Sequence, residues 1–327
     1  MTKKLNMDSI RLIASFLIVA IHISPFDQIN PNFDFFFTRI FCRIAVPIFL
    51  MITGYYIIDK SLKDINILKN YTKKILKIYL LSILIYIPIN IYMNQQFNWL
   101  TIIKDILFNG TMYHLWYFPA LILGIWLTYF LIKKGKNKTL IIVFILYILG
   151  LLGDSYYGLV EMNEWLRNIY NVFFNIFDYT RNGIFYVPIF LYLGYWIKEK
   201  NKDYKNGIIY IILFFLSLTL EGLILHHYKF QRHDSMYLFL IPLMYFLFNY
   251  LITNFKGNNK LLRNISTEIY ILHPLVIVGI RFISGLINLD KYIVNNHLIL
   301  YIIVCFTTFL LAIIIEKLKK IKFKLNA

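Results

Sequence analysis

The first long apolar run of the chain reads IRLIASFLIVAIHI at residues 10–23, and it contains one arginine and one histidine. Arg11 and His22 are eleven positions apart, which is about three turns of an α-helix, so both side chains lie on one helix face about 16 Å apart. Charged groups at membrane depth are costly and usually face a bundle interior, a cavity or each other. The alternative is that Arg11 reaches the cytoplasmic surface and His22 sits near the opposite interface. The rest of the chain favours the first interpretation.

The composition is typical of a protein embedded in a bilayer. Of the 327 residues, 59% are hydrophobic and 18% are aromatic, and the mean hydropathy is +0.62. Soluble domains do not have this composition. Apolar runs close to the length that crosses a bilayer recur along the chain. They predict an all-α fold, a polytopic membrane bundle of about ten transmembrane helices, with spans at 9–25, 38–58, 75–93, 113–132, 139–153, 183–198, 206–226, 236–254, 267–286 and 297–316. We expect one integral membrane domain over residues 1–327, ending in a short basic tail at 317–327.

The net charge of +17 follows the topology of such a bundle. Most Lys and Arg residues fall in alternate segments between the spans, for example Lys3 and Lys4 before the first span and Lys317, Lys319 and Lys320 after the last. This is the positive-inside bias of membrane proteins. It predicts a multi-pass protein of a bacterial-type plasma membrane with both termini in the cytoplasm. The lysines are then topology signals and contacts for membrane lipid, and no nucleic-acid partner is expected.

The two cysteines point to no metal and no disulfide framework. Cys42 and Cys305 both fall within apolar spans, without CxxC or metal-ligand spacing. We therefore expect no metal site in this chain.

Polar residues inside or beside the spans gather in the outer half of the expected bundle. Arg39 and Arg43 are four apart, on one face of a regular α-helix. Glu221 follows a long apolar run and needs a cation or a protonated state. Together these groups predict a vestibule of mixed charge that opens outward and suits a small polar or zwitterionic molecule or a sugar hydroxyl. The candidate substrate-binding residues are Arg39, Arg43, His114, Trp116, Asp178, Arg181, Glu221, Asp234 and His273.

Several stretches in their order resemble the acyltransferase-3 membrane family. The first is the Arg11-to-His22 spacing, and three others support it: RIAVPIFLMITGYY (43–56), HLWYFPAL (114–121) and STEIYILHP (266–274). The resemblance covers nearly the whole chain. Many members have Ser-Gly where this chain has Thr53-Gly54, a change that keeps the hydroxyl group.

Within that family, two stretches are similar to the membrane domain of the vancomycin-resistance serine racemases. They are DYTRNGIFYVPIF (178–190) and RHDSMYL (232–238). Those racemases continue into a cytoplasmic pyridoxal-phosphate domain, which residues 1–327 do not contain. The resemblance therefore implies either a stand-alone relative or the membrane half of such a protein, with a cytoplasmic racemase domain or subunit as a partner.

The resemblance implies an O-acyltransferase that takes acyl-CoA, with acetyl-CoA the expected donor, from the cytoplasm and acylates a hydroxyl group reached from outside. An alcohol is a weak nucleophile at neutral pH and needs a positioned base, which His22 can be. Arg11 would orient His22 indirectly or hold the phosphate or pantetheine groups of the donor. His22 and Arg11 are thus the candidate catalytic residues.

Two other functions remain open from the sequence. The chain could transport or deliver L-serine for a racemase, with Arg39 or Arg43 holding the carboxylate and an acidic residue meeting the ammonium group. It could also be a structural protein with a decayed site. The intact spacing of Arg11 and His22 places acyl transfer ahead of both.

Overall fold

The computed structural model describes residues 6–93, 98–200 and 207–325, with side chains up to residue 321 at the C-terminal end. All regular structure in these residues is helical. Lys3 and Lys4, together with the last two residues of the expected basic tail, lie outside the described residues. The chain divides into two compact units: unit 1 comprises residues 1–46 and 251–327, and unit 2 comprises residues 47–250. The expectation of one domain over the whole chain stays a prediction.

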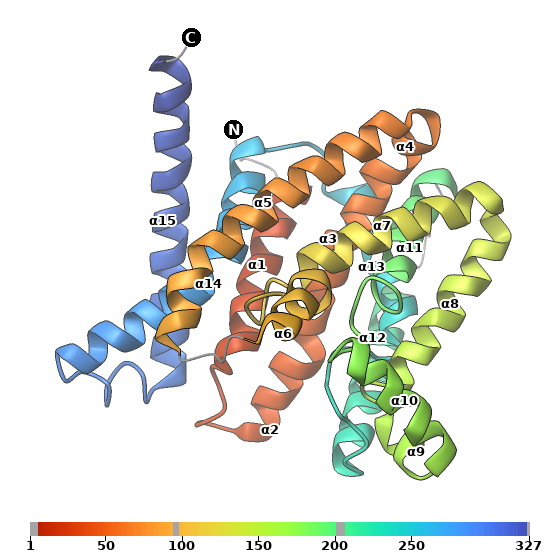
Figure 1. The fold of residues 1–327 in the computed structure, drawn as a ribbon, viewed down its shortest axis with the longest axis horizontal. Helices are drawn as coiled ribbons and strands as arrows, with labels where there is room; N and C mark the ends of the chain where they lie inside the picture. Colours follow the sequence, from red (N-terminus) through yellow and green to blue (C-terminus); the bar gives the residue numbers. More distant parts are fainter. Residues whose placement is uncertain (1–5, 94–97, 201–206, 326–327) are drawn as a thin grey trace. The chain divides into compact units, whose positions relative to one another are not determined.

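Unit 1 is built on three long helices that pack together, α1 (Met7–Ile23), α14 (Lys260–Leu286) and α15 (His297–Leu325) (Figure 1). Its core is aliphatic and includes Val19, Ile269 and Val304. α1 begins sharply because Asn6 caps it: the Asn6 side chain accepts hydrogen bonds from the backbone of Asp8 and Ser9. The unit also contains α2 (Pro31–Asp34), the π-helix η1 (Phe35–Ile40) and the 3-10 helix η2 (Phe41–Ile44).

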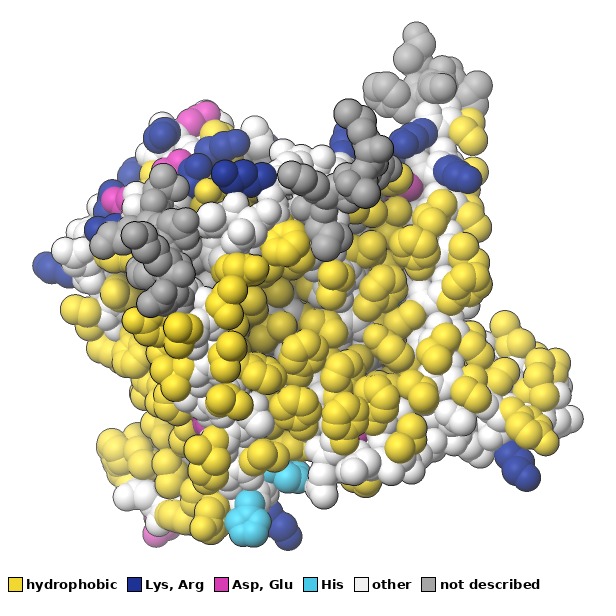
Figure 2. All heavy atoms as spheres, turned by 180° about the vertical axis from the view of Figure 1, so that it is seen from behind, with side chains coloured by type: hydrophobic (Ala, Val, Ile, Leu, Met, Phe, Trp, Pro, Cys, Tyr) yellow, Lys and Arg dark blue, Asp and Glu magenta, His cyan; other side chains and the backbone are white. Residues whose placement is uncertain are grey.

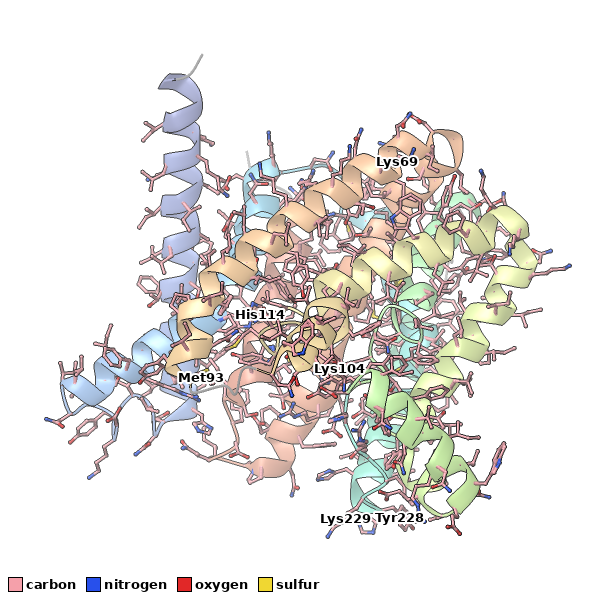
Figure 3. All side chains as sticks on the ribbon, in the orientation of Figure 1. Lys69, Met93, Lys104, His114, Tyr228 and Lys229 are labelled. Carbon is pink, nitrogen blue, oxygen red and sulfur yellow. The ribbon has the colours of Figure 1, made fainter. Side chains whose placement is uncertain are left out.

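Unit 2 contains the remaining helices and most of the two that cross its limits, α3 and α13. Long helices of this unit end at its opposite extremities, and Figure 3 places Lys69 at one extremity and the Tyr228–Lys229 turn at the other. The elements in chain order are α3 (Ala45–Thr53), η3 (Gly54–Ile58), α4 (Asp59–Lys63), α5 (Ile65–Tyr92), α6 (Trp99–Lys104), η4 (Asp105–Asn109), α7 (Tyr117–Lys134), α8 (Lys136–Leu152), α9 (Tyr157–Glu161), α10 (Glu164–Ile176), α11 (Val187–Lys200), α12 (Gly207–His227) and α13 (Leu240–Asn254).

The helices confirm a multi-pass membrane fold. Each of the ten expected spans coincides with a helix or a continuous helical segment, and six of these are long and apolar enough to cross a bilayer. The remaining four, α1, α8, α11 and α13, are 14–17 residues long. Hydrophobic side chains cover much of the face drawn in Figure 2, and only about a fifth of the apolar window in α12 and in α15 is buried inside the protein. Surfaces of this kind face lipid.

Two glycines let the helical segment 31–63 cross α11 at backbone distance. A Cβ atom on Gly54 would lie 2.0 Å from the carbonyl oxygen of Leu191, and one on Gly194 would lie 2.1 Å from that of Met51. The contact is reciprocal, and its two points are three positions apart on each helix. Small residues at a helix crossing are typical of membrane bundles, where close packing replaces the hydrophobic driving force. The glycine after Thr53 is therefore required by packing.

Replacement of Gly194 by alanine should destabilise unit 2 by about 1–3 kcal/mol, because the added methyl group meets backbone that cannot move aside. Thermal unfolding of the purified protein in detergent would measure the loss. Gly279→Ala is the matched control, since a Cβ atom there has no atom within 4 Å and alanine favours a helix. Equal melting temperatures for the two variants would contradict the packing argument.

Candidate functional site

His22 and His273 meet in unit 1, although 251 positions separate them in the sequence. His22 lies in the last turn of α1 and is half-buried, whereas His273 lies in the middle of α14 and is completely buried. The two imidazole rings are stacked, with centroids 5.2 Å apart and planes 25° apart. The structure thus brings together one candidate catalytic residue and one candidate substrate-binding residue.

Pro274 determines how the ring of His273 is held. A proline has no backbone N–H, so the carbonyl oxygen of Tyr270 loses its usual helical partner four residues later. The Nδ1 atom of His273 lies 2.9 Å from that oxygen and 3.1 Å from the carbonyl oxygen of Ile269. Carbonyl oxygens only accept hydrogen bonds, so Nδ1 must carry the hydrogen and Nε2 is the basic nitrogen of the neutral ring. The Leu-His-Pro sequence therefore fixes both the tautomer and the orientation of this imidazole.

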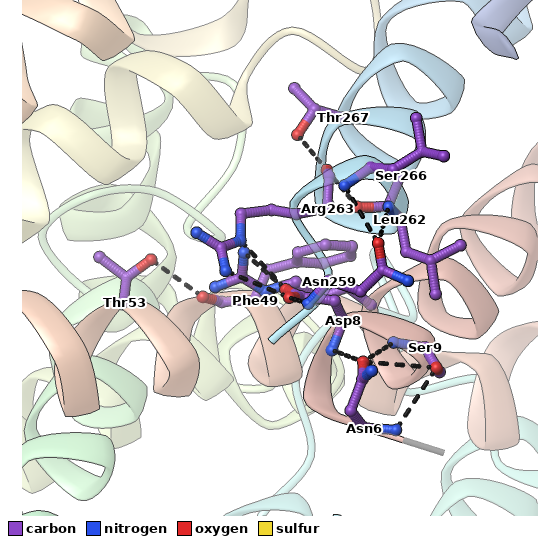
Figure 4. A network of polar contacts seen from close by, with 12 residues as sticks. Asn6, Asp8, Ser9, Phe49, Thr53, Asn259, Leu262, Arg263, Ser266 and Thr267 are labelled. Atoms are coloured by element: carbon purple, nitrogen blue, oxygen red, sulfur yellow. Dashed lines mark hydrogen bonds and ion pairs between the residues drawn. The ribbon is translucent and has the colours of Figure 1, made fainter. Parts of the chain in front are cut away.

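Asp8, at the other end of α1, is the centre of an ionic network (Figure 4), and Arg11 belongs to this network. Arg11 Nη1 lies 3.6 Å from Asp8 Oδ1. Arg263 binds the same carboxylate through two nitrogens, each at 3.1 Å, and the backbone N–H of Asn259 donates to it at 2.6 Å. The Asp8 side chain is almost fully buried. Asp8 and Arg263 were not among the expected site residues, although an acid three positions before Arg11 on a helix is a signal that the sequence contains.

Arg39 and Arg43 also lie in unit 1, but the regular α-helix expected across them is wrong. The backbone passes from the π-helix η1, which contains Arg39, directly into the 3-10 helix η2, which contains Arg43. Such departures from α-helical geometry frequently mark functional sites. Arg43 is buried, with 9% of its surface exposed, and Arg39 is half-buried.

In unit 2, Arg181 is held between aromatic rings. Its guanidinium carbon lies 4.5 Å from the ring centroid of Tyr179 and 5.2 Å from that of Trp116, and its Nη1 atom donates to Ser235 Oγ at 3.2 Å. A guanidinium group that stacks on rings in this way is stabilised by cation–π attraction. The expected residues Trp116 and Arg181 are therefore direct neighbours.

His114 lies just before α7, at the place labelled in Figure 3. It is almost fully buried, and the ring of Tyr86 from α5 meets it edge-on at a centroid distance of 4.9 Å. An imidazole packed in this way belongs to the interior of unit 2.

Asp178 is bound by two side chains from the segment between α5 and α7. Lys104 Nζ lies 2.6 Å from its Oδ1, and Asn109 Nδ2 donates to its Oδ2 at 2.7 Å. Neighbouring Asp105 is affected as well: burial raises the pKa of its carboxyl group and the charge of Asp178 adds to the rise, while the hydrogen bond from Asn109 and the charge of Lys104 oppose it. Lys104 and Asn109 could not be assigned to this cluster from the sequence, because about seventy residues separate them from Asp178.

The sequence indicates that a buried Glu221 needs a cation or a proton, but in the structure hydrogen-bond donors stabilise its carboxylate instead. Its carboxylate accepts hydrogen bonds from the backbone N–H groups of Leu238 at 2.6 Å and Phe239 at 2.9 Å, and from the hydroxyl group of Tyr156 at 2.8 Å. These donors lie just before α13 and just before α9. Glu221 thus ties α12 to both segments.

A second buried acid, Asp154, was not among the expected residues. It accepts hydrogen bonds from the backbone N–H groups of Ser235 and Met236, at 2.7 and 2.9 Å, and so fixes the loop that contains Asp234. Asp234 is half-buried, and one of its oxygens, Oδ1, is buried with no hydrogen-bond partner among the described residues. The vestibule expected from residues of both units stays a prediction, since each unit is described by itself.

Comparison with known proteins gives two findings. A family model described as "Acyltransferase domain" matches residues 4–317. The chain is also 43% identical over 322 residues to an "Amino-acid racemase" of Enterococcus faecalis, covering 96% of this chain and 45% of that protein. It is 37% identical over 321 residues to a "Serine/alanine racemase" of Enterococcus gallinarum, covering 94% of this chain and 45% of that protein. The chain thus spans about half the length of these curated relatives, and no solved structure matches it.

Proposed function

Because this chain belongs to the acyltransferase-3 family, we propose that it transfers an acyl group from a cytoplasmic acyl-CoA to a hydroxyl group of an extracytoplasmic small molecule or glycan. The observation that supports this activity is the stacked pair of His22 and His273, in which a chain carbonyl fixes the tautomer of one ring. A pair of oriented imidazoles is suited to move a proton to and from a reacting oxygen.

His22 is the proposed general base. Its imidazole takes the proton of the acceptor hydroxyl while the hydroxyl oxygen forms a bond to the carbonyl carbon of the thioester. The carbon–sulfur bond then breaks, and the imidazolium returns the proton to the departing thiolate of CoA. His273 holds the plane of the His22 ring through the stack, so that the base is oriented before the acceptor arrives.

Arg11 is the other proposed catalytic residue, and it has two roles to choose between. A guanidinium pairs well with phosphate, so Arg11 could hold phosphate or pantetheine groups of the donor near the inner face. It could instead support His22 through the network of Asp8, which already offsets part of its charge. The donor-binding role requires the start of α1 to lie on the cytoplasmic side, as the expected topology has it.

L-Serine handling is the second candidate, and the names of the relatives favour it. Their length leaves room for a further domain, so a cytoplasmic racemase domain or subunit is the proposed partner. In unit 1, Arg39 or Arg43 is the proposed contact for a carboxylate. In unit 2, Asp178, Glu221 or Asp234 is the proposed contact for an ammonium group, and each unit is considered by itself. The internal partners of Asp178 and Glu221 argue against those two and leave Asp234 as the better site.

One reconstitution separates the two functions. The purified chain in proteoliposomes should release CoA from acetyl-CoA in a reaction that depends on an added hydroxyl acceptor, and label from the acetyl group should appear in the acceptor. Protein-free liposomes are the control. Saturable counterflow of labelled L-serine without any acyl transfer would replace the acyltransferase with the serine function, and the absence of both activities would exclude both proposals.

A further inference from the structure

We propose that Asp8 is a positioning residue: it clamps the N-terminal turns of α1 and α14 in register and thereby sets the stacking of His22 on His273. The catalytic part of this proposal rests on the acyltransferase function, whereas the clamp itself does not. Asp8 lies in the first turn of α1, and its carboxylate also meets the first turn of α14, where Asn259 is the N-cap residue.

The spacing of the two contact points carries the argument. α1 and α14 run in parallel, since they meet at Asp8 with Asn259 near their beginnings and at His22 with His273 further along. Asp8 precedes His22 by fourteen residues, and Asn259 precedes His273 by fourteen residues. Fourteen residues are close to four helical turns and rise about 21 Å. Two parallel helices with equal spacing between two contacts keep those contacts only at one relative height.

The clamp is strong enough to select that height. Arg263 approaches the carboxylate through Nε and Nη2 at 3.1 Å each, an arrangement in which both oxygens are used. Such bidentate pairs are directional as well as charged. The backbone N–H of Asn259 adds a third hydrogen bond at 2.6 Å. The Asp8 side chain is 3% exposed, so water has little access to the carboxylate, whereas the Arg263 side chain is 41% exposed and reaches solvent. A shift of α1 by one residue would move its side chains by about 1.5 Å along the axis and by 100° around it, which would break every one of these bonds.

The role of Arg11 follows from the same geometry. At 3.6 Å from Asp8, Arg11 is the third cationic or polar partner of one carboxylate, and Arg263 already uses both oxygens. This contact favours the second of the two proposed roles of Arg11, in which it acts on His22 through Asp8 and the helix register. This assigns a position-setting function to the start of α1, where Asp8 lies about four turns from the imidazole of His22.

A cross-linking experiment measures the register without any assay of activity. In the full chain with Cys42→Ala and Cys305→Ala, the pair His22→Cys and His273→Cys reports how well the two helix positions face each other. Oxidation in native membranes, followed by mass spectrometry of the linked peptides, gives the cross-linked fraction. Adding Asp8→Asn should lower this fraction about fivefold or more, the effect of losing roughly 1 kcal/mol of a charged contact. The control Asp27→Asn, an exposed acid after α1, should leave it unchanged.

Two further results decide the proposal. Arg263→Lys keeps the charge but loses the bidentate geometry, so it should also lower the cross-linked fraction. A cross-linked fraction equal to that of the parent in either variant would overturn the clamp. If the Asp8→Asn protein does not accumulate in the membrane, Arg263→Lys alone provides this test. In a chain with both histidines intact, Asp8→Asn should lower kcat about tenfold or more at an unchanged KM for acetyl-CoA. A raised KM at unchanged kcat would instead assign the network to donor binding. If the parent shows no acyl transfer, the proposed function fails while the cross-linking still decides the clamp.

Discussion

Replacement of His22 by alanine is expected to lower acyl transfer by about 10²- to 10⁴-fold, the contribution of a positioned general base. The side chain is half-buried beside His273, and its removal leaves only a small gap at the end of α1. The fold should therefore survive. Transfer of labelled acetyl groups by proteoliposomes of equal protein content measures the loss.

His226→Ala is the matched control for this variant. His226 lies in the last turn of α12, where its side chain is exposed, so the same chemical change should leave the rate close to that of the parent. Equal melting temperatures of the three proteins would show that the loss does not come from unfolding. Parental turnover in His22→Ala would remove His22 from the mechanism.

Replacement of Glu221 by alanine is expected to destabilise unit 2 by about 3–5 kcal/mol, among the largest effects of a single substitution. The carboxylate is 6% exposed and accepts three hydrogen bonds, so its removal leaves two backbone N–H groups and one hydroxyl group in part-buried positions without their acceptor. Each donor that loses its acceptor away from bulk water costs about 1–3 kcal/mol, and partial burial keeps the sum below the upper limit. Thermal or denaturant unfolding in detergent would measure the change.

Two further variants provide an intermediate and a near-zero reference for this loss of stability. Glu221→Gln keeps one acceptor oxygen and should lose about half as much stability. Glu164→Ala removes an exposed acid from the first turn of α10 and should change stability by about 0.5 kcal/mol at most. If Glu221→Ala and Glu164→Ala have the same melting temperature, the three hydrogen bonds do not hold α12 to the segment that leads into α13.

The helical fold was accessible from the sequence because apolar runs in a membrane protein are long and nearly continuous. Helix type was not accessible in the same way. The segment around Arg39 and Arg43 reads as regular α-helix, yet its backbone is π-helical and then 3-10 helical. That choice depends on how each carbonyl finds a donor in the packed protein, which hydrophobic periodicity does not encode.

The candidate site shows the same division between local and distant information. The shared face of Arg11 and His22 follows from helix geometry, and the tautomer of His273 follows from the adjacent Pro274 once the helix is known. The partners of these residues do not. His273 stacks on His22 across 251 positions, and Arg263 binds Asp8 across 255, so only the folded chain brings them together. For Glu221, the sequence correctly indicated that a buried carboxylate needs a stabilising partner. Two of its three donors are backbone N–H groups, which almost every residue has, so no residue pattern could identify them.

The hydrogen bonds from His273 Nδ1 to two helix carbonyls limit proton transfer through this imidazole. A histidine that relays protons must accept on one nitrogen and release from the other, and then turn over to begin again. Here the Nδ1 side is closed by the helix backbone, because giving up that proton would leave the Tyr270 carbonyl oxygen without either its proline-blocked partner or its substitute. His273 can therefore exchange a proton only through Nε2. It can only be the terminal member of a chain of proton transfers, so a pathway that conducts protons across the membrane cannot pass through this ring.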